Sequence, residues 1–184
     1  MAWRIVLDSM VWAQAAVGHR QDRRGPSAEI LHLALYRMLV VVASSYVRAE
    51  VLGVLLEERH FRRKLAPAVD PEAWLDESLA ACAELVEVTG PPVLQAHAKD
   101  DPILWLAAAG GASHLVTWEA RLLDLKHYRF TQVMTPTDFL RAWRDPAAHE
   151  PTLEWQALRR GPTLRPRRTR RAATGGQAPA SAAV

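Results

Sequence analysis

The chain has 184 residues, a length typical of one domain, and its 49% hydrophobic and 23% charged residues are typical of a globular protein. A single cysteine, Cys82, excludes an internal disulfide and any zinc site built from several cysteines. Apolar runs stay far below the roughly 18 residues that span a membrane, and Arg4 and Asp8 interrupt the first apolar stretch, unlike a secretory signal. We therefore expect a cytoplasmic protein without membrane contact.

The formal charge of +3 hides a division of the chain into two parts. Residues 159–184 hold seven of the 23 basic residues and no acidic residue, so residues 1–158 carry 16 basic and 20 acidic residues, a net charge of −4. The arginine-rich end has too few large apolar residues to offset the entropy cost of ordering, which predicts disorder from about residue 159. It is either a basic arm that adds affinity for phosphates or a solvated extension without a role.

The first half of the chain alternates short apolar runs with helical patterns. The predicted elements are a strand at 3–7, a short helix at 11–17, a helix at 27–37 capped by Ser27, a strand at 38–43 and a helix at 46–58 capped by Ser44-Ser45. Residues 20–26 are expected to form a polar loop, and residues 61–69 a basic and partly irregular connection.

The second half repeats the alternation. The predicted elements are a helix at 72–85 after the cap Asp70-Pro71, a strand at 86–88, a helix from Asp101-Pro102 to Gly110-Gly111, a strand at 114–117, a helix at 119–125, a strand at 132–134 and a helix at 136–143. Strands that alternate with helices favour an α/β fold, here a three-layer α/β/α sandwich around a mainly parallel sheet. We expect one domain at 1–145 and a C-terminal extension at 146–184.

Four acidic residues follow the predicted strands or begin the helices after them: Asp8, Glu50, Asp101 and Glu119. Working groups of open α/β sheets gather at the carboxyl ends of the strands, and Glu50 is expected at the edge of the apolar stripe of its helix. Singly, each acid has an ordinary explanation as a helix cap or a surface residue. Together they would repel by about 4 kcal/mol per close pair at an effective dielectric constant near 20. A divalent cation removes that cost, and oxygen ligands favour Mg²⁺ or Mn²⁺.

The segments that carry these acids resemble a PIN domain, the fold of VapC-like toxin ribonucleases in bacterial and archaeal toxin–antitoxin pairs. The matching segments are residues 5–11, 43–51, 100–107 and 113–119, followed by 121–123 and 133–140, so the resemblance covers roughly residues 3–143. It implies a site of Asp8, Glu50, Asp101 and Glu119 that binds Mg²⁺ or Mn²⁺ and cleaves RNA. Spacing from the strand at 115–117 favours Asp101 over Asp100 as the third acid, and Ser9 and Thr117 are the expected supporting hydroxyls.

Three residues depart from the family pattern. Met10 stands where many members have asparagine, Trp118 stands where glycine is common, and Glu119 replaces the usual aspartate with a longer side chain. Trp118, like Trp105 after Asp101, either stacks on an unpaired base or packs in the protein. These departures leave open a catalytically degenerate module that binds RNA or a protein partner.

Two short basic clusters are candidate contacts for RNA phosphates. They contain Arg20, Arg23 and Arg24 in one loop and Arg62, Arg63 and Lys64 in another, and they either guide RNA to the acidic site or are solvated surface. The predicted function is a metal-dependent endoribonuclease, the toxin of a type II toxin–antitoxin pair. By family analogy its partners are RNA, a cognate antitoxin and a second copy of the chain.

Overall fold

The computed structural model describes residues 3–20, 25–65, 69–90 and 98–146, except for the side chains of residues 19 and 20. The predicted basic tail and the loop residues Arg23 and Arg24 lie outside the described residues, and so does nearly all of the predicted C-terminal extension.

The described residues form one six-stranded sheet in the order β3-β2-β1-β4-β6-β5. Its strands are β1 (Trp3–Leu7), β2 (Leu39–Ala43), β3 (Ala83–Leu85), β4 (His114–Val116), β5 (His127–Tyr128) and β6 (Thr131–Met134). All neighbouring strands run parallel except β5, which pairs antiparallel with β6. Because the carboxyl ends of parallel strands face the same way, the chain leaves β1, β2 and β4 at one edge of the sheet.

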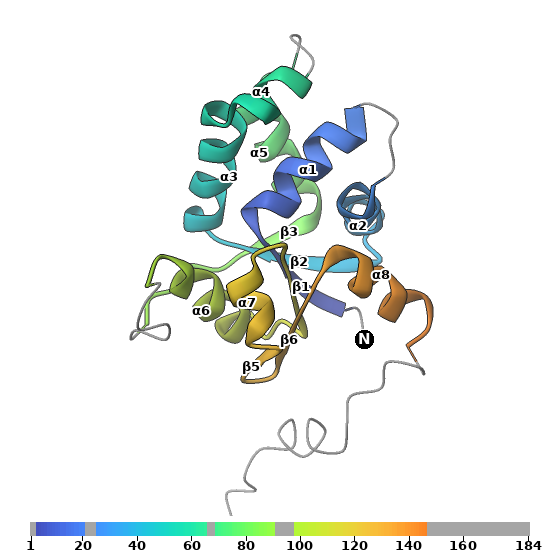
Figure 1. Cartoon of the computed structure of the whole chain (residues 1–184), viewed down its shortest axis with the longest axis vertical. Helices are drawn as coiled ribbons and strands as arrows, with labels where there is room; N and C mark the ends of the chain where they lie inside the picture. The colour runs from blue at the N-terminus through green and yellow to red at the C-terminus, as the bar shows by residue number, and fades with distance from the viewer. Residues whose placement is uncertain (1–2, 21–24, 66–68, 91–97, 147–184) are drawn as a thin grey trace, which may run out of the picture.

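Helices cover both faces of this sheet. They are α1 (Ser9–Arg20), α2 (Pro26–Leu35), α3 (Ser45–Glu57), α4 (Arg59–Lys64), α5 (Pro71–Cys82), α6 (Asp101–Ala109), α7 (Ala120–Asp124) and α8 (Pro136–Arg144), with a 3₁₀ turn, η1 (Ala98–Asp100), before α6. Figure 1 shows α1, α2, α3 and α5 on one side of the sheet and α6 and α7 on the other. The predicted three-layer α/β/α sandwich is confirmed. Crossing a bilayer would need a longer and more apolar helix than any found among the described residues.

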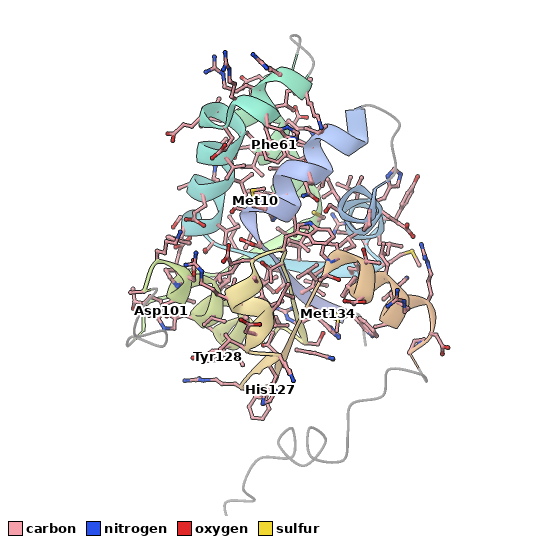
Figure 2. The ribbon with its side chains drawn as sticks, in the orientation of Figure 1. Met10, Phe61, Asp101, His127, Tyr128 and Met134 are labelled. Carbon is pink, nitrogen blue, oxygen red and sulfur yellow. The ribbon has the colours of Figure 1, made fainter. Side chains whose placement is uncertain are left out.

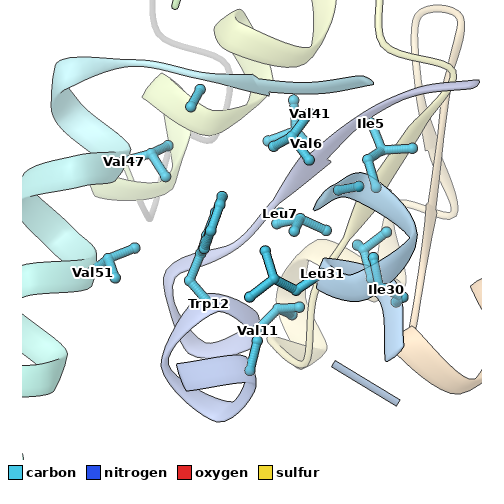
Figure 3. Packing of buried hydrophobic residues seen from close by; sticks show 14 of the residues in the cluster. Ile5, Val6, Leu7, Val11, Trp12, Ile30, Leu31, Val41, Val47 and Val51 are labelled. Carbon is cyan, nitrogen blue, oxygen red and sulfur yellow. The ribbon is translucent and has the colours of Figure 1, made fainter. Parts of the chain in front are cut away.

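The core lies on both faces of the sheet, between the central strands and the helices that cover them, α6 included. Ile5, Val6 and Leu7 are fully buried, as expected for a central strand of a parallel sheet. Trp12 of α1 is also fully buried and lies between β1 and Val47 and Val51 of α3 (Figure 3). This packing fixes the distance of α1 and α3 from the end of β1, where the acidic side chains begin.

Aromatic side chains close the opposite end of the central strands. Trp3 begins β1 and stacks on His114, the first residue of β4, with ring centroids 4.6 Å apart. Phe139 and Trp143 of α8 contact Trp3 edge-on, at 5.7 Å and 5.3 Å between ring centroids. Phe139 is fully buried, so α8 seals the amino ends of β1 and β4.

Two predicted boundaries in the first half differ from the structure. Gly25, not Ser27, precedes α2, and the Ser27 hydroxyl donates instead to Gln14 Oε1 of α1, at 3.1 Å. Residues 59–64 form the helix α4 instead of an irregular connection, because Phe61 is buried and gives this basic segment an anchor.

Two boundaries in the second half differ as well. Residues 83–85, predicted as the end of a helix, form the strand β3, which pairs with β2; the strand predicted at 86–88 is therefore displaced by three residues. The two-residue strand β5 was not predicted, because it is too short to show an alternating pattern.

Candidate acidic site at the strand ends

A cavity of about 210 Å³ opens at the carboxyl ends of β1 and β4, and four carboxylates from separate segments line it. They are Asp8, Glu50, Asp100 and Glu119. The other lining residues are Ser9, Met10, Tyr46, Val54, Lys99, Ile103 and Leu122. Asp8, Glu50 and Glu119 were predicted to share a site, whereas Asp100, Tyr46 and Lys99 were not.

Asp8 owes its position to the pairing of β1 with β4. Leu7 lies opposite Val116, so the next residues, Asp8 and Thr117, leave the sheet side by side. The Thr117 hydroxyl donates to Asp8 Oδ2 at 2.6 Å, and the backbone N–H of Ser9 donates to Asp8 Oδ1 at 2.7 Å. The Asp8 carbonyl accepts a hydrogen bond from the N–H of Trp12, and this is the first bond of the helix α1. Thr117 through its hydroxyl and Ser9 through its N–H therefore both bond to the Asp8 carboxylate.

The environment of Asp8 penalises its charge. Burial raises the pKa of this carboxyl above its ordinary value, and the neighbouring charge of Asp100 raises it further, although the hydrogen bonds from Thr117 and Ser9 act in the opposite direction. A carboxylate that is buried beside another acid gains from any cation that enters the cavity.

Glu50 enters the cavity from α3. Ser44 directly follows β2 and caps α3 by accepting the N–H of Val47, so α3 begins at the carboxyl end of β2. The Tyr46 hydroxyl, one turn before Glu50, lies 2.9 Å from Glu50 Oε1. Glu50 was expected at the edge of the core, but its side chain is exposed on the open side of the cavity.

The third acid that lines the cavity is Asp100, whereas Asp101 was the residue expected there. Asp101 is the first residue of α6 and is 1% exposed, and its side chain does not line the cavity. Proline is tolerated throughout the first turn of a helix, so the Asp-Pro pattern leaves the start of α6 undetermined by one residue. A shift of one residue in the start of α6 decides which of the two aspartates lines the cavity and which is buried in the interior.

Asp100 is unusual for an aspartate at the N-cap. Its side chain accepts no capping hydrogen bond from α6, although aspartate commonly does so at this position. Its Oδ2 is buried and has no hydrogen-bond partner among the described residues. A buried carboxylate oxygen without a donor is costly, and a cation in the cavity would remove this cost.

Glu119 lies at the rim of the cavity, before α7. Its N–H donates to Thr117 Oγ1 at 2.9 Å, which links it to the hydroxyl that holds Asp8. Its carboxylate forms an ion pair with Arg121, with Oε1 and Nε 3.1 Å apart. Of the three residues that depart from the family pattern, Met10 and Glu119 line the cavity, and Trp118 immediately precedes Glu119. Met10 and Trp118 are both exposed.

The four carboxylates share the cavity without converging on one point. In the described part of the chain, no group of three Asp, Glu, His or Cys side chains is arranged so that it could hold a metal ion. Each of three acids has a local partner: Thr117 for Asp8, Tyr46 for Glu50 and Arg121 for Glu119. Metal binding would therefore require rotation of at least some of these side chains.

The basic clusters lie apart from the cavity. Arg62, Arg63 and Lys64 are exposed on α4, which follows the end of α3 that is remote from the sheet (Figure 2). From Tyr46 to α4 the helix α3 spans about 20 Å at 1.5 Å per residue. Arg20 ends α1, and its side chain lies outside the described part, like Arg23 and Arg24.

The basic residue of the cavity itself is Lys99, which sequence reasoning missed, as it missed Tyr46. Tyr46 could have been found from the sequence, because it lies four residues before Glu50 on the same predicted helix and therefore on the same face. Lys99 lies in a 3₁₀ turn that no periodic pattern announces. Trp105, considered as a stacking residue, lines a different cavity together with Gly90 and Tyr128.

Comparisons with protein-family models, with curated proteins and with solved structures each found no match.

Proposed function

We propose that the protein is a divalent-metal-dependent endoribonuclease of the PIN-domain type, with Asp8, Glu50 and Asp100 as its metal-binding carboxylates and Glu119 as an accessory acid. The observation that carries this proposal is the gathering of four carboxylates from separate segments in one cavity at the strand ends. The order of the parallel strands around β1 supports it, because this order brings the segments after β1, β2 and β4 to one edge.

The chemistry of the side chains fits a hard divalent cation. The carboxylates offer oxygen ligands, which favour Mg²⁺ or Mn²⁺ over zinc. Asp100 Oδ2 is buried without a partner among the described residues, and the pKa of Asp8 is raised by burial and by Asp100. Both observations indicate negative charge at Asp8 and Asp100 that the neighbouring groups do not fully compensate. In this proposal Asp8, Glu50 and Asp100 hold the ion, and Glu119 leaves Arg121 to assist.

When bound, a divalent ion lowers the pKa of water and stabilises the charge that develops on a phosphodiester. The chain supplies the remaining functions. Thr117 and Ser9 fix the rotamer of Asp8 through hydrogen bonds, and the ammonium group of Lys99 offers a positive charge to the phosphate of an approaching RNA. The exposed arginines of α4 add an attraction of longer range, which is screened by salt.

The biological role proposed with this activity is that of a toxin in a type II toxin–antitoxin pair, acting in the cytoplasm and as a homodimer. This role rests on the resemblance of the sequence to VapC-like ribonucleases. A cognate antitoxin would cover the acidic cavity with a basic or aromatic segment. Such a segment would compensate the same negative charge that a metal ion does.

A second candidate is a module that binds RNA or a protein partner without cleaving RNA. It is favoured by the ion pair between Glu119 and Arg121 and by the separation of the carboxylates, since no three of them converge within the described residues. In this alternative Met10 and Trp118 are apolar contacts at the mouth of a cavity that has lost its metal.

Cleavage of a fluorescently labelled single-stranded RNA in Mn²⁺, measured for Glu50→Gln and Glu57→Gln, tests the proposal. Both variants remove one exposed carboxylate from α3, but only Glu50 lines the cavity. We expect Glu50→Gln to lose more than about 10-fold in rate, since even indirect contacts to a metal are worth 10- to 100-fold, and Glu57→Gln to retain the wild-type rate. RNA binding by the wild type without any cleavage at millimolar Mn²⁺ would instead favour the binding module.

A further inference from the structure

Tyr46 is the contact between the two sides of the acidic cavity. Its hydroxyl lies 2.9 Å from Glu50 Oε1 on its own helix and 2.6 Å from the backbone carbonyl of Lys99, which is 53 residues away in sequence. Lys99 immediately precedes Asp100, the acid whose Oδ2 has no partner in the described part of the chain. One hydroxyl therefore connects α3, which carries Glu50, to the turn that carries Asp100.

This contact restricts two groups that are otherwise weakly held. Glu50 is an exposed side chain with several rotatable bonds, so it loses rotational freedom when it binds a metal unless it is already ordered. Asp100 belongs to a three-residue 3₁₀ turn and makes no capping bond to α6. Asp8, in contrast, is fixed by the register of β1 and β4 and by three donors on two neighbouring residues.

The phenol is suited to a permanent hydrogen bond. Tyr46 is partly buried, and its hydroxyl has two acceptors within hydrogen-bond distance, Glu50 Oε1 and the carbonyl of Lys99. Its single proton is shared between a carboxylate and a carbonyl. Because both acceptors bond to the same hydroxyl, the position of the Glu50 carboxylate is coupled to that of the Lys99 carbonyl.

We propose that Tyr46 is a positioning residue, which sets the distance between Glu50 and Asp100 across the cavity and thereby the affinity of the site for a divalent cation. Tyr46 touches neither the ion nor the RNA in this account. The inference rests on the proposed metal-dependent function, and it concerns a residue outside the set of acids that the family resemblance implies.

Isothermal titration with Mn²⁺ alone, on the wild type, Tyr46→Phe and the control Tyr36→Phe, tests this inference. Tyr36 follows α2, is 72% exposed and does not line the cavity. Tyr36→Phe therefore removes the same hydroxyl group at a position away from the cavity. We expect Tyr46→Phe to weaken Mn²⁺ binding about 10- to 100-fold, the usual effect of residues that orient metal ligands, and Tyr36→Phe to bind as the wild type does. Thermal melting without metal verifies that both variants are folded.

The metal dependence of RNA cleavage supplies a readout that a purely structural role would not move. Tyr46→Phe should need a higher Mn²⁺ concentration for half-maximal cleavage and should recover the wild-type rate at saturating Mn²⁺. A wild-type protein that binds Mn²⁺ and a Tyr46→Phe variant with the same affinity would overturn the inference and leave the proposed function intact. A rate that stays low at saturating Mn²⁺ would also overturn it, and a wild-type protein that binds no Mn²⁺ would overturn both.

Discussion

The two ends of the central strands have opposite characters. At the amino ends, Trp3 stacks on His114, and the fully buried Phe139 packs edge-on against them. At the carboxyl ends, Asp8 is buried with a raised pKa, and Asp100 has an oxygen without a partner among the described residues. The first arrangement stabilises the fold, whereas the second costs stability.

This contrast indicates where function lies, because unfavourable electrostatics persist only where the surrounding structure holds them in place. The same two strands, β1 and β4, begin in the aromatic cluster and end in the acidic cavity. We therefore expect changes at the two ends to separate stability from metal binding and cleavage.

The largest expected effect is on stability, at the aromatic end. Replacing Phe139 with alanine removes a fully buried ring that packs edge-on against both Trp3 and His114. We expect a loss of about 3–5 kcal/mol in the free energy of unfolding, measured by urea denaturation. The fraction that remains folded should bind Mn²⁺ with unchanged affinity. A variant of wild-type stability, or a folded variant with weakened Mn²⁺ binding, would contradict the separation of the two ends.

The largest expected effect on activity is at the acidic end. Asp8→Asn removes the charge of the most firmly held carboxylate but keeps groups that can bond to Ser9 and Thr117. Cleavage of single-stranded RNA in Mn²⁺ should fall more than about 100-fold, because direct ligands are worth more than the residues that orient them. Circular dichroism should show an intact fold. Undiminished cleavage would exclude the proposed role of Asp8.

The smallest expected effect is on the pH dependence of stability in metal-free protein. A folded-state pKa of Asp8 above its ordinary value of 3.8 means that the unfolded chain loses this proton first as the pH rises. Stability is therefore lost between the ordinary pKa and the raised folded-state pKa, and the loss persists at higher pH.

The matched comparison for this effect is Asp8→Asn, which has no such titration. Asp76, Glu84 and Glu87 have lowered pKa values and change stability in the opposite sense, but they are present in both proteins and cancel in the difference. Urea denaturation in EDTA from pH 3 to 8 should show that the variant gains stability relative to the wild type as the pH rises. A constant difference would contradict the raised pKa.

Much of the fold could be predicted from the sequence, because strong local signals mark its elements. β1 and β2 are short β-branched runs, Ser44 and Asp70 accept capping hydrogen bonds from Val47 and Glu72, and Gly110-Gly111 ends α6. Gly111 has φ of +61°, a conformation in which glycine is favoured. The sequence did not predict α4, because the helical conformation of this basic segment depends on the tertiary packing of the buried Phe61.

The candidate site was predictable only in part, for a geometric reason. Asp8, Glu50 and Glu119 follow strands or the caps of helices, so the topology of a parallel sheet brings them to one edge. The choice between Asp100 and Asp101 depends on a single residue at the start of α6, and the sequence contains no signal of that precision. Tyr46 and Lys99 meet through a contact across 53 residues, which no local pattern reveals.

The central claim is that the strand-end cavity binds a divalent cation through Asp8, Glu50 and Asp100. Anomalous X-ray scattering from crystals of the protein soaked in Mn²⁺ tests it most directly. The account predicts a manganese peak within the cavity, with carboxylate oxygens of these residues among its ligands and Asp101 excluded. A peak bound by Asp101 instead of Asp100, a peak only at another surface, or no peak at millimolar Mn²⁺ would contradict it.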